Sequence, residues 1–248
     1  MIILSILFFI TAILYSSVGF GGGSTYLALL LIWDIPYYIF PIIALLCNII
    51  VVSGNSFNYI RAGNHNFKLL LPFLIGSVPF AFFGGTLKMD KDIFEILLFF
   101  VLSVAGILLL INNKSYENNN LIIKKLNLFI SLSIGSILGL ISGIVGIGGG
   151  IFLSPILFLL KVEKPKIIVT TASLFILINS ISGILGQLTK ENILTELSNY
   201  IPLFISVFIG GLLGNYLNLK IFTSRVLAII TSLLVIFVSI RMGIRIFL

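Results

Sequence analysis

The sequence is poor in the residues on which most enzyme chemistry depends. It contains one cysteine, one histidine and one tryptophan among 248 residues, and charged residues make up only 9%. The lone Cys47 excludes an intrachain disulfide and a cysteine metal cluster, and we expect it to be an inert packing residue. The lone His65 lies in a polar loop, where a solvated role is expected, and no acidic pair lies within an apolar run. Because no base or nucleophile is in place, we predict that the protein is not an enzyme and needs no cofactor.

Apolar residues dominate instead. Hydrophobic residues make up 59% of the chain and the mean hydropathy is +1.23, a balance that no soluble domain of this length needs. The composition therefore predicts an all-α, polytopic integral membrane protein. The net charge is +7, but the basic residues lie in short gaps between apolar runs, where membrane topology places them, so nucleic-acid binding is not expected. The stretch 1–17 has no basic leader region and no cleavage motif, so we interpret it as a mature membrane segment.

Eight apolar segments are predicted, since about 20 residues are needed to cross roughly 30 Å of hydrocarbon. The first and the fifth are longer than one crossing requires. The most polar stretch separates the fourth from the fifth, so the chain divides into a first membrane repeat at 1–112, a polar linker at 113–125 and a second membrane repeat at 126–248. The segments are Ile2–Trp33, Tyr37–Ile60, Phe67–Leu87, Ile93–Ile111, Leu126–Leu160, Ile167–Leu188, Leu197–Leu219 and Val226–Leu248.

Two glycine clusters, at 19–23 and 146–150, interrupt the overlong segments 127 positions apart. Such internal symmetry is typical of secondary transporters, whose binding sites lie at paired helix breaks near the middle of the bilayer. Lipid tolerates these breaks only where the freed backbone groups line protein or water. Other residues match in the same order with offsets up to 130: Ser53 with Ser182, Gly54 with Gly183, Pro72 with Pro202, Gly84 with Gly214 and Leu87 with Leu217.

The distribution of basic residues favours inverted repeats. If all eight segments cross the membrane, one side collects eight basic residues and the other seven, which is no bias. If the first and fifth segments fold back at their glycines as re-entrant hairpins, each half crosses three times and the count becomes ten against five. The second arrangement satisfies the rule that cytoplasmic loops carry the excess of basic residues. A single kinked and tilted helix at each glycine cluster is the alternative, since glycines also produce kinks.

The hairpin interpretation predicts an anion-binding site at the glycine breaks. Half-helices that begin at Ser24 and Ile151 would direct backbone N–H groups and the positive ends of their dipoles into the bilayer interior. Glycine allows a positive φ and lets a ligand approach the backbone. Hydroxyl and amide side chains near the breaks would add uncharged donors. The candidate substrate-binding residues are Gly21, Gly22, Gly23, Ser24, Thr25, Asn48, Gly148, Gly149, Gly150, Thr171, Ser173 and Asn179.

Each candidate residue also has a purely structural interpretation. Glycines allow helices to pack closely in membranes, and buried hydroxyl and amide groups form hydrogen bonds between helices. Acidic and basic residues lie at the ends of the predicted segments, so the sequence shows no charged cation pathway and no buried proton relay. Neither glycine cluster has the spacing of a phosphate-binding loop, which argues against a nucleotide site.

The stretch Gly146-Ile-Gly-Gly-Gly-Ile-Phe-Leu-Ser-Pro155-Ile-Leu resembles the G-x-G-G-G-x-x-x-x-P-x-L signature of the TauE/SafE family of sulfite exporters and sulfonate permeases. The duplicated glycine motif and the stretches at 63–72 and 171–174 extend the resemblance to essentially the whole chain. One departure is Ala28, which stands where the first copy would carry the counterpart of Pro155. The resemblance implies a permease or exporter of small sulfur oxyanions or organosulfonates in the cytoplasmic membrane of a prokaryote, coupled to an ion gradient.

Two other functions would use the same residues. A passive anion channel would offer the same donors without alternating access, and a membrane scaffold or assembly factor would use the glycines only to pack helices. The expected partners are a small anion and membrane lipid, with H+ or Na+ as candidate coupling ions. The identity of the anion, the direction of transport and the formation of a homodimer are left open by the sequence.

Overall fold

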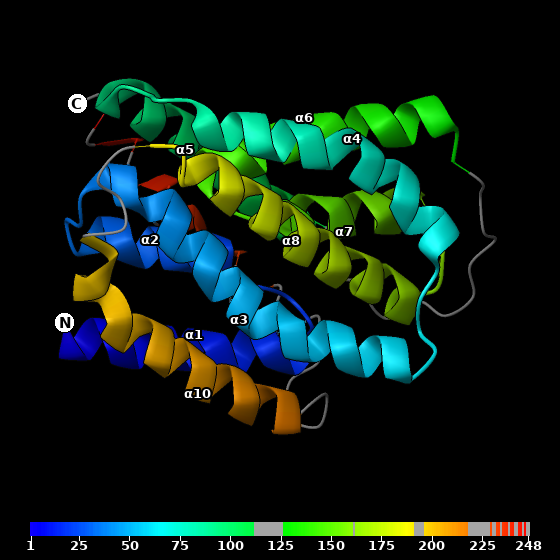
Figure 1. Ribbon diagram of the computed structural model, residues 1–248, viewed down its shortest axis with the longest axis horizontal. Helices are drawn as coiled ribbons and strands as arrows, with labels where there is room; N and C mark the ends of the chain where they lie inside the picture. Colours follow the sequence, from blue (N-terminus) through cyan, green and yellow to red (C-terminus); the bar gives the residue numbers. More distant parts are fainter. Residues whose placement is uncertain are drawn as a thin grey trace.

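The structure, a computed structural model, describes residues 1–111, 126–160, 162–190 and 196–217, and isolated positions between 229 and 246. Every regular element among these residues is helical, which confirms the predicted all-α class (Figure 1). The predicted linker and most of the segment 226–248 lie outside the described residues. The helices are α1 (Ile2–Val18), α2 (Gly23–Ile32), α3 (Phe40–Arg61), α4 (Phe67–Thr86), α5 (Lys91–Ile111), α6 (Leu128–Val145), α7 (Gly150–Leu160), α8 (Pro165–Gln187) and α10 (Ile201–Leu217), with the 3-10 turns η1 (Tyr37–Ile39) and η3 (Ser198–Tyr200).

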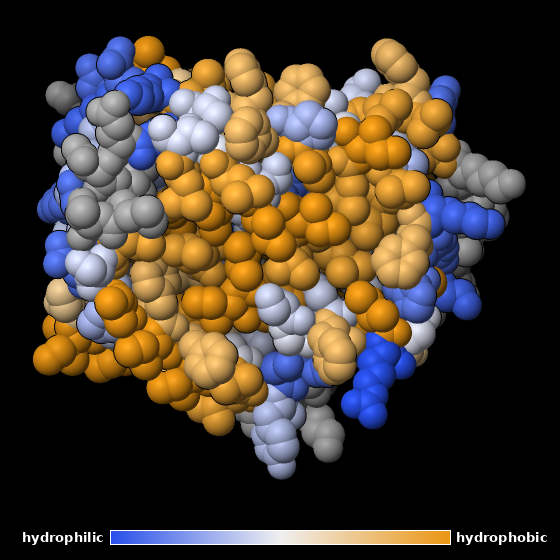
Figure 2. All heavy atoms as spheres, viewed as in Figure 1, coloured by the Kyte–Doolittle hydropathy of each residue, from blue (hydrophilic) through white to orange (hydrophobic). Residues whose placement is uncertain are grey.

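Several of the described helices have the length and composition of membrane spans. Five are long and apolar enough to cross a bilayer: Tyr37–Arg61, Phe67–Thr86, Leu128–Val145, Lys166–Gln187 and Ser198–Tyr216. Figure 2 shows hydrophobic residues across the middle of one face and hydrophilic residues gathered mainly at its two ends. Large apolar side chains such as Phe129 and Phe208 are more than half exposed on the outer surface. Such a surface suits lipid, because exposing this much apolar surface to water is unfavourable in free energy.

The two longest central helices, α3 and α8, cross each other in opposite directions. Leu45, near the start of α3, lies beside Gly183, near the end of α8. Farther along α3, Ser56 forms a 3.1 Å hydrogen bond with Ser173 in the first half of α8. Residue numbers therefore rise along one helix as they fall along the other.

Two other helix pairs run parallel and pack closely through glycine. In the first pair, Gly139 and Gly143 of α6 lie against the backbone of Ser77 and Ala81 of α4. In the second pair, α10 packs on α1, and Ser16 donates a 2.8 Å hydrogen bond to the carbonyl of Gly211. Because glycine has no side chain, the backbones in both pairs come within direct contact. Each pair joins a helix of the first half of the chain to a helix of the second half.

The remaining contacts order the helices into two sets. Helix α8 runs parallel to α4, since Ser182 donates a 2.7 Å hydrogen bond to the carbonyl of Val78 and Gly186 lies beside Phe82. Helix α3 runs parallel to α10, since Asn58 donates a 2.9 Å hydrogen bond to Asn215 and Gly211 lies beside Val51. Helices α1, α3 and α10 therefore run in one direction, and α4, α6 and α8 run in the opposite one.

Neighbouring glycines in α10 provide a matched test of the α1 contact. A Cβ on Gly210 would lie 2.5 Å from the carbonyl oxygen of Phe9 and 3.0 Å from Ala12 Cβ, whereas a Cβ on Gly211 would find only ordinary contact with Val51 at 3.7 Å. We expect Gly210→Ala to lower the stability of the protein by about 1–3 kcal/mol through overpacking. Gly211→Ala should be neutral or slightly stabilising. Thermal unfolding of both variants in detergent measures the difference, and equal melting temperatures would contradict this packing.

Candidate functional site

Glycine ends α1 and begins α2. Gly19 follows the last residue of α1 with φ 86°, and the N–H of Phe20 donates to the carbonyl of Tyr15 at 3.0 Å, which caps the helix. Gly22 precedes α2 with φ 84°. Both values lie in the left-handed region, which residues with a side chain rarely adopt. The local sequence therefore provides two sharp changes of direction within four residues.

At this first break the chain reverses its direction. The rings of Phe8 in α1 and Tyr26 in α2 lie 4.8 Å apart, and the hydroxyl groups of Tyr15 and Thr25 are 2.7 Å apart in a buried hydrogen bond. In one continuous helix residues 8 and 26 would be separated by about 27 Å, because each residue advances the helix by 1.5 Å. Helix α2 thus returns alongside α1 toward the end of the molecule that carries the N-terminus (Figure 1).

The second glycine cluster forms a corresponding turn between α6 and α7. Gly146, Gly148 and Gly149 have φ values of 92°, 82° and 76°. After the turn, the Cβ position of Gly149 lies 3.5 Å from the carbonyl oxygen of Leu138, eleven residues earlier in the chain. Gly150 then contacts Ile176 in the middle of α8, and α7 runs back toward the start of α8 (Figure 1). Both glycine clusters are therefore tips of helical hairpins.

The two tips meet at Asn48, a fully buried residue in the middle of α3. Its side-chain Nδ2 donates to the carbonyls of Ile147 at 3.1 Å and Gly146 at 3.4 Å, both in the second tip. The same side chain contacts the first tip, since Asn48 Nδ2 lies 2.8 Å from the Cβ position of Gly23 and Asn48 Oδ1 faces Gly21. One amide therefore lies between two glycine breaks that are more than 100 positions apart in the sequence.

We call the place where the two glycine tips, 19–23 and 146–150, meet at Asn48 the junction. Residues of α8 close its other side. Ile176 Cγ2 lies 3.2 Å from the Cβ position of Gly21 and 2.9 Å from that of Gly148, so it contacts both tips. Ser180 Oγ lies 3.2 Å from the Cβ position of Gly148. A side chain at Gly21 or Gly148 would collide with Asn48 or Ile176, which explains why these two positions are glycine.

The junction collects polar groups that have no partner in the protein. The first backbone N–H in α2 with an acceptor is that of Thr25, which donates to Gly22, so those of Gly23 and Ser24 precede the helical ladder. In α7 the corresponding first donor is Phe152, which donates to Gly149. Side-chain atoms that are buried without a hydrogen-bond partner include Ser24 Oγ, Asn48 Oδ1 and Ser180 Oγ at the junction. Others include Thr171 Oγ1 and Asn179 Oδ1 along α8 and side-chain atoms of Asn55, Ser77, Ser142 and Ser154 in α3, α4, α6 and α7. Orphaned buried polar groups are rare in folded proteins and mark candidate binding sites.

Comparison with known proteins identifies the family. The family description "Sulfite exporter TauE/SafE" matches residues 4–242, which is nearly the whole chain. The chain belongs to the TauE/SafE family. The resemblance found in the glycine motifs is thereby confirmed, and with it the expectation of a membrane transporter.

Curated relatives of this TauE/SafE chain are named as probable membrane transporter proteins. One from Sinorhizobium fredii is 26% identical over 235 residues, covering 93% of both chains. One from Methanocaldococcus jannaschii is 30% identical over 198 residues, covering 76% of this chain and 73% of the relative. A third, from Bacillus subtilis, is 22% identical over 259 residues. No solved structure gives a significant match.

The structure places the predicted site residues of this TauE/SafE protein at different distances from the junction. The glycines and Asn48 lie at the junction itself, and Ser24 lies beside them at the start of α2. The hydroxyl of Thr25 is bonded to Tyr15. Ser173 is bonded to Ser56, eight residues beyond Asn48 on α3, which corresponds to about 12 Å along the helix. The Asn179 amide donates to the carbonyl of Phe175 at 2.8 Å and keeps its oxygen unpaired, and Thr171 lies nearer the start of α8.

Three residues at the junction were not among the predicted site residues. The Tyr15 hydroxyl is hydrogen-bonded to Thr25, Ile176 contacts both tips, and Ser180 presents an unpaired hydroxyl beside Gly148. Ser180 gave a usable signal, because it is one of several hydroxyl residues within the apolar run of α8. Ile176 and Tyr15 gave no such signal, because the sequence does not show in which direction an isoleucine or a tyrosine of a membrane helix points.

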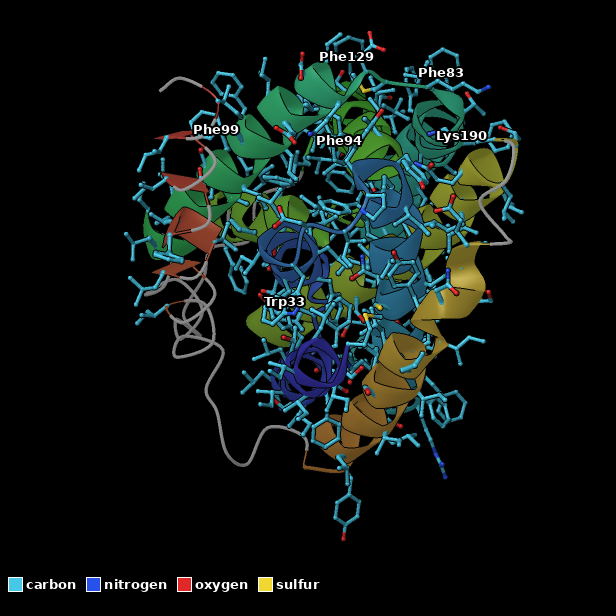
Figure 3. The ribbon with its side chains drawn as sticks, turned by 90° about the vertical axis from the view of Figure 1, so that its left-hand side faces the viewer. Trp33, Phe83, Phe94, Phe99, Phe129 and Lys190 are labelled. Atoms are coloured by element: carbon cyan, nitrogen blue, oxygen red, sulfur yellow. The ribbon has the colours of Figure 1, made fainter. Side chains whose placement is uncertain are left out.

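Lys190, at one end of the helices, has a lowered pKa. Lys190, just beyond α8 and labelled in Figure 3, donates a 2.8 Å hydrogen bond to Gln187 Oε1. Partial burial lowers the pKa of Lys190 from 10.5 to about 8, and the positive charge of Lys88 adds to the shift. Gln187 in turn donates to the carbonyl of Gly143 at 2.8 Å, which ties α8 to α6.

The lowered pKa predicts an unusually reactive amine. We expect modification of Lys190 by an amine reagent, followed by peptide mass spectrometry, to show a midpoint near pH 8, and Lys88→Gln to move that midpoint upward. Because the pKa is lower in the folded than in the unfolded protein, the folded state releases this proton first. The Lys190 contribution therefore makes the protein more stable as the pH rises from about 8 to 10.5. A midpoint near 10.5 in the wild-type protein would show that the amine is fully solvated.

Proposed function

We propose that this protein is a secondary transporter of a small anion, most simply a sulfur oxyanion or organosulfonate, in the cell membrane of a prokaryote. The observation that carries this proposal is the meeting of two glycine-tipped helical hairpins at Asn48, deep inside the helices. Family membership supports transport as the activity. The family description names sulfite export, and the curated relatives come from bacteria and an archaeon.

The helix directions support inverted repeats as the architecture. In this interpretation α1 with α2 corresponds to α6 with α7, α3 to α8 and α4 to α10. Each corresponding pair runs in opposite directions, as inverted halves require. The matched residues Gly54 and Gly183 then fall on corresponding helices, as do Gly84 and Gly214. The two hairpins would enter the bilayer from opposite sides and end near its middle.

The chemistry of the tips favours an anion. The N-terminal ends of α2 and α7 lie at the junction, and each helix dipole places roughly half a positive charge there. In the first tip the Ser24 hydroxyl is buried and unpaired, whereas the second tip continues into Ile151 and Phe152. We infer that the anion lies nearer the first tip, where one hydroxyl donor supplements the free backbone N–H groups.

The basic residues at the helix ends support an orientation. Asn66 donates a 3.0 Å hydrogen bond to Glu163, which places the α3–α4 loop and the start of α8 at one end of the molecule. Basic residues there are Arg61, Lys68, Lys164 and Lys166, and those described at the opposite end are Lys88, Lys91 and Lys190. The four residues at the first end all fall on the richer side of the ten-to-five distribution that inverted repeats give for the whole sequence, and on that distribution we infer that the first end faces the cytoplasm.

Burial of the junction favours alternating access over a channel. Asn48, Ser24 and Ser180 are at most 1% exposed, so the site is closed to both ends. A transporter passes through such an occluded state, whereas a conducting channel needs a continuous path. The glycine-packed pairs α4 with α6 and α1 with α10 would move as rigid units against each other.

Counterflow in proteoliposomes tests the proposal. Vesicles containing the purified protein are loaded with unlabelled sulfite, thiosulfate or taurine, and uptake of the same labelled compound is followed. We expect transient accumulation above equilibrium for at least one sulfur anion. Single-channel current without counterflow would support the channel instead, and the absence of any saturable uptake or binding would support a scaffold.

A further inference from the structure

We propose that the junction of the two hairpins also binds a sodium ion, held by Asn48 Oδ1, Ser180 Oγ and backbone carbonyls of the glycine breaks. The inference rests on the proposed function, because it names the ion whose gradient would drive anion transport. It begins from oxygen atoms that the fold buries and leaves without a partner.

The orientation of the Asn48 amide is fixed by its neighbours. Its Nδ2 donates to two carbonyls of the second tip, those of Gly146 and Ile147, and an oxygen in that position would face two other oxygens. Asn48 Oδ1 must therefore point toward Gly21, where it is fully buried and accepts no hydrogen bond. An uncharged oxygen aimed in this way is an acceptor that lacks a donor, and a cation satisfies it.

A second unpaired oxygen lies on the opposite wall. Ser180 Oγ is completely buried, has no hydrogen-bond partner and lies 3.2 Å from the Cβ position of Gly148, a point that is 2.8 Å from Asn48 Nδ2. Asn48 on α3 and Ser180 on α8 thus flank the same glycine of the second tip. The amide nitrogen of Asn48 faces Gly148 and its oxygen faces Gly21, so a cation that reaches both oxygens would lie between these two glycines. A hydroxyl can supply either a proton or a lone pair, so it can complete the coordination of a cation.

The helix ends add negative potential at the same place. Helices α1 and α6 both end at the junction, and the last carbonyls of a helix carry the negative end of its dipole. One of these carbonyls, that of Ile147, lies 2.7 Å from the Cβ position of Gly23 and so reaches from the second tip to the first. Unwound carbonyls and helix C-termini are the groups with which broken-helix transporters coordinate sodium.

A metal ion fits these residues better than a proton. Within the described chain, every Asp, Glu, His, Lys and Arg lies in a loop or near the end of a helix. The weak acids near the junction include the phenols of Tyr15 and Tyr26 and the thiol of Cys47, groups that keep their protons at neutral pH. Proton coupling therefore lacks a carrier at the junction. Sodium is the smaller of the two abundant alkali cations, which suits the close packing of both tips against Asn48 and Ile176.

The two ions would assist each other. An isolated charge is strongly disfavoured in a low-dielectric interior, whereas a sodium ion at the end of α1 cancels one negative charge of an anion at the start of α2. Each ion should therefore raise the affinity for the other by the same factor.

Thermal unfolding of the purified full chain tests the sodium site without knowledge of the natural anion. The protein is melted in potassium gluconate with increasing sodium gluconate at constant ionic strength, so that the anion stays the same throughout and contains no sulfur. We expect a saturable rise of the melting temperature with sodium. Ser180→Ala should raise the half-saturating sodium concentration at least tenfold. Ser182→Ala, two residues away on the same helix, is the matched control because its hydroxyl is already bonded to the carbonyl of Val78.

The outcomes separate this inference from the proposed function. If sodium has no more effect than potassium on the wild-type protein, or if Ser180→Ala responds like the wild type, the sodium site is overturned. A parallel titration with thiosulfate in potassium gluconate reports on the anion alone. Stabilisation by thiosulfate without a sodium effect would leave the transport proposal standing and refute the sodium site. A Ser180-dependent sodium effect without stabilisation by any sulfur anion would support the cation site and count against the proposed substrate class.

Discussion

Gly22→Val and Gly149→Val are each expected to abolish counterflow, with transport reduced at least a hundredfold, while the protein still accumulates in the membrane. Both glycines have a positive φ, 84° and 76°, which costs an ordinary residue roughly 1–2 kcal/mol and a β-branched residue more. A side chain at Gly149 would also lie 2.8 Å from the Phe175 ring. The tip must therefore change shape, and the backbone N–H groups of α2 or α7 would no longer point at the junction. Labelled-anion counterflow, normalised to the amount of reconstituted protein, measures the loss.

Gly63 provides the control for backbone strain alone. It has φ 73°, comparable to that of Gly149, but nothing lies within 4 Å of its Cβ position in the loop between α3 and α4. Gly63→Val should lower the melting temperature, because valine is strained at this φ as it would be at Gly149. Transport per folded protein should be unchanged. If Gly63→Val abolished transport as completely as Gly149→Val, the loss could not be assigned to the junction.

The second large effect is expected for Asn48→Leu. Leucine has the same branching at Cγ as asparagine but is bulkier, and it cannot donate to the carbonyls of Gly146 and Ile147, which would remain buried without a partner. We expect a loss of about 1–3 kcal/mol of stability, the usual cost of an unsatisfied buried group, together with loss of transport. Thermal unfolding and counterflow of the same preparation measure the two effects.

Asn58→Leu is the matched control on the same helix. Asn58 also donates a side-chain hydrogen bond, to Asn215, but this contact is exposed, so its removal should change stability by less than about 0.5 kcal/mol. An Asn48→Leu protein that melts and transports like the wild type would mean that the amide does not organise the two tips.

The broken helices could be predicted from the sequence because glycine acts locally. The residues Gly19 to Gly23 and Gly146 to Gly150 interrupt apolar runs that would otherwise continue as helix, and the structure ends and restarts helices within these residues. The predicted starts at Ser24 and Ile151 differ from the observed starts, Gly23 and Gly150, by one residue. The reversal of the chain was one of two interpretations, and the contact of Phe8 with Tyr26 distinguishes them.

The composition of the junction could be predicted only in part. Asn48 is conspicuous as an amide within an apolar run, and the structure places it between the tips. Ser173 has the same appearance in sequence, yet it pairs with Ser56 away from them. The difference depends on how α3 and α8 cross, and a crossing is set by packing between helices distant in sequence rather than by local propensity. For the same reason Ile176, which contacts both tips, could not be distinguished from other apolar residues of α8.

The parallel packing of α1 on α10 has a consequence for biogenesis. The partner of the first helix is residues 201–217, which leave the ribosome after almost the whole chain has been made. At roughly 5–20 residues per second, α1 and its hairpin would wait on the order of ten to forty seconds in the membrane. During that interval the exposed backbone of Ser16 and its neighbours has no protein partner, so the nascent first half would depend on lipid, the insertion machinery or a chaperone. Neither half of the chain is complete as a folding unit, and separate expression of the halves would have to reunite α1 with α10 and α4 with α6 before either could become stable.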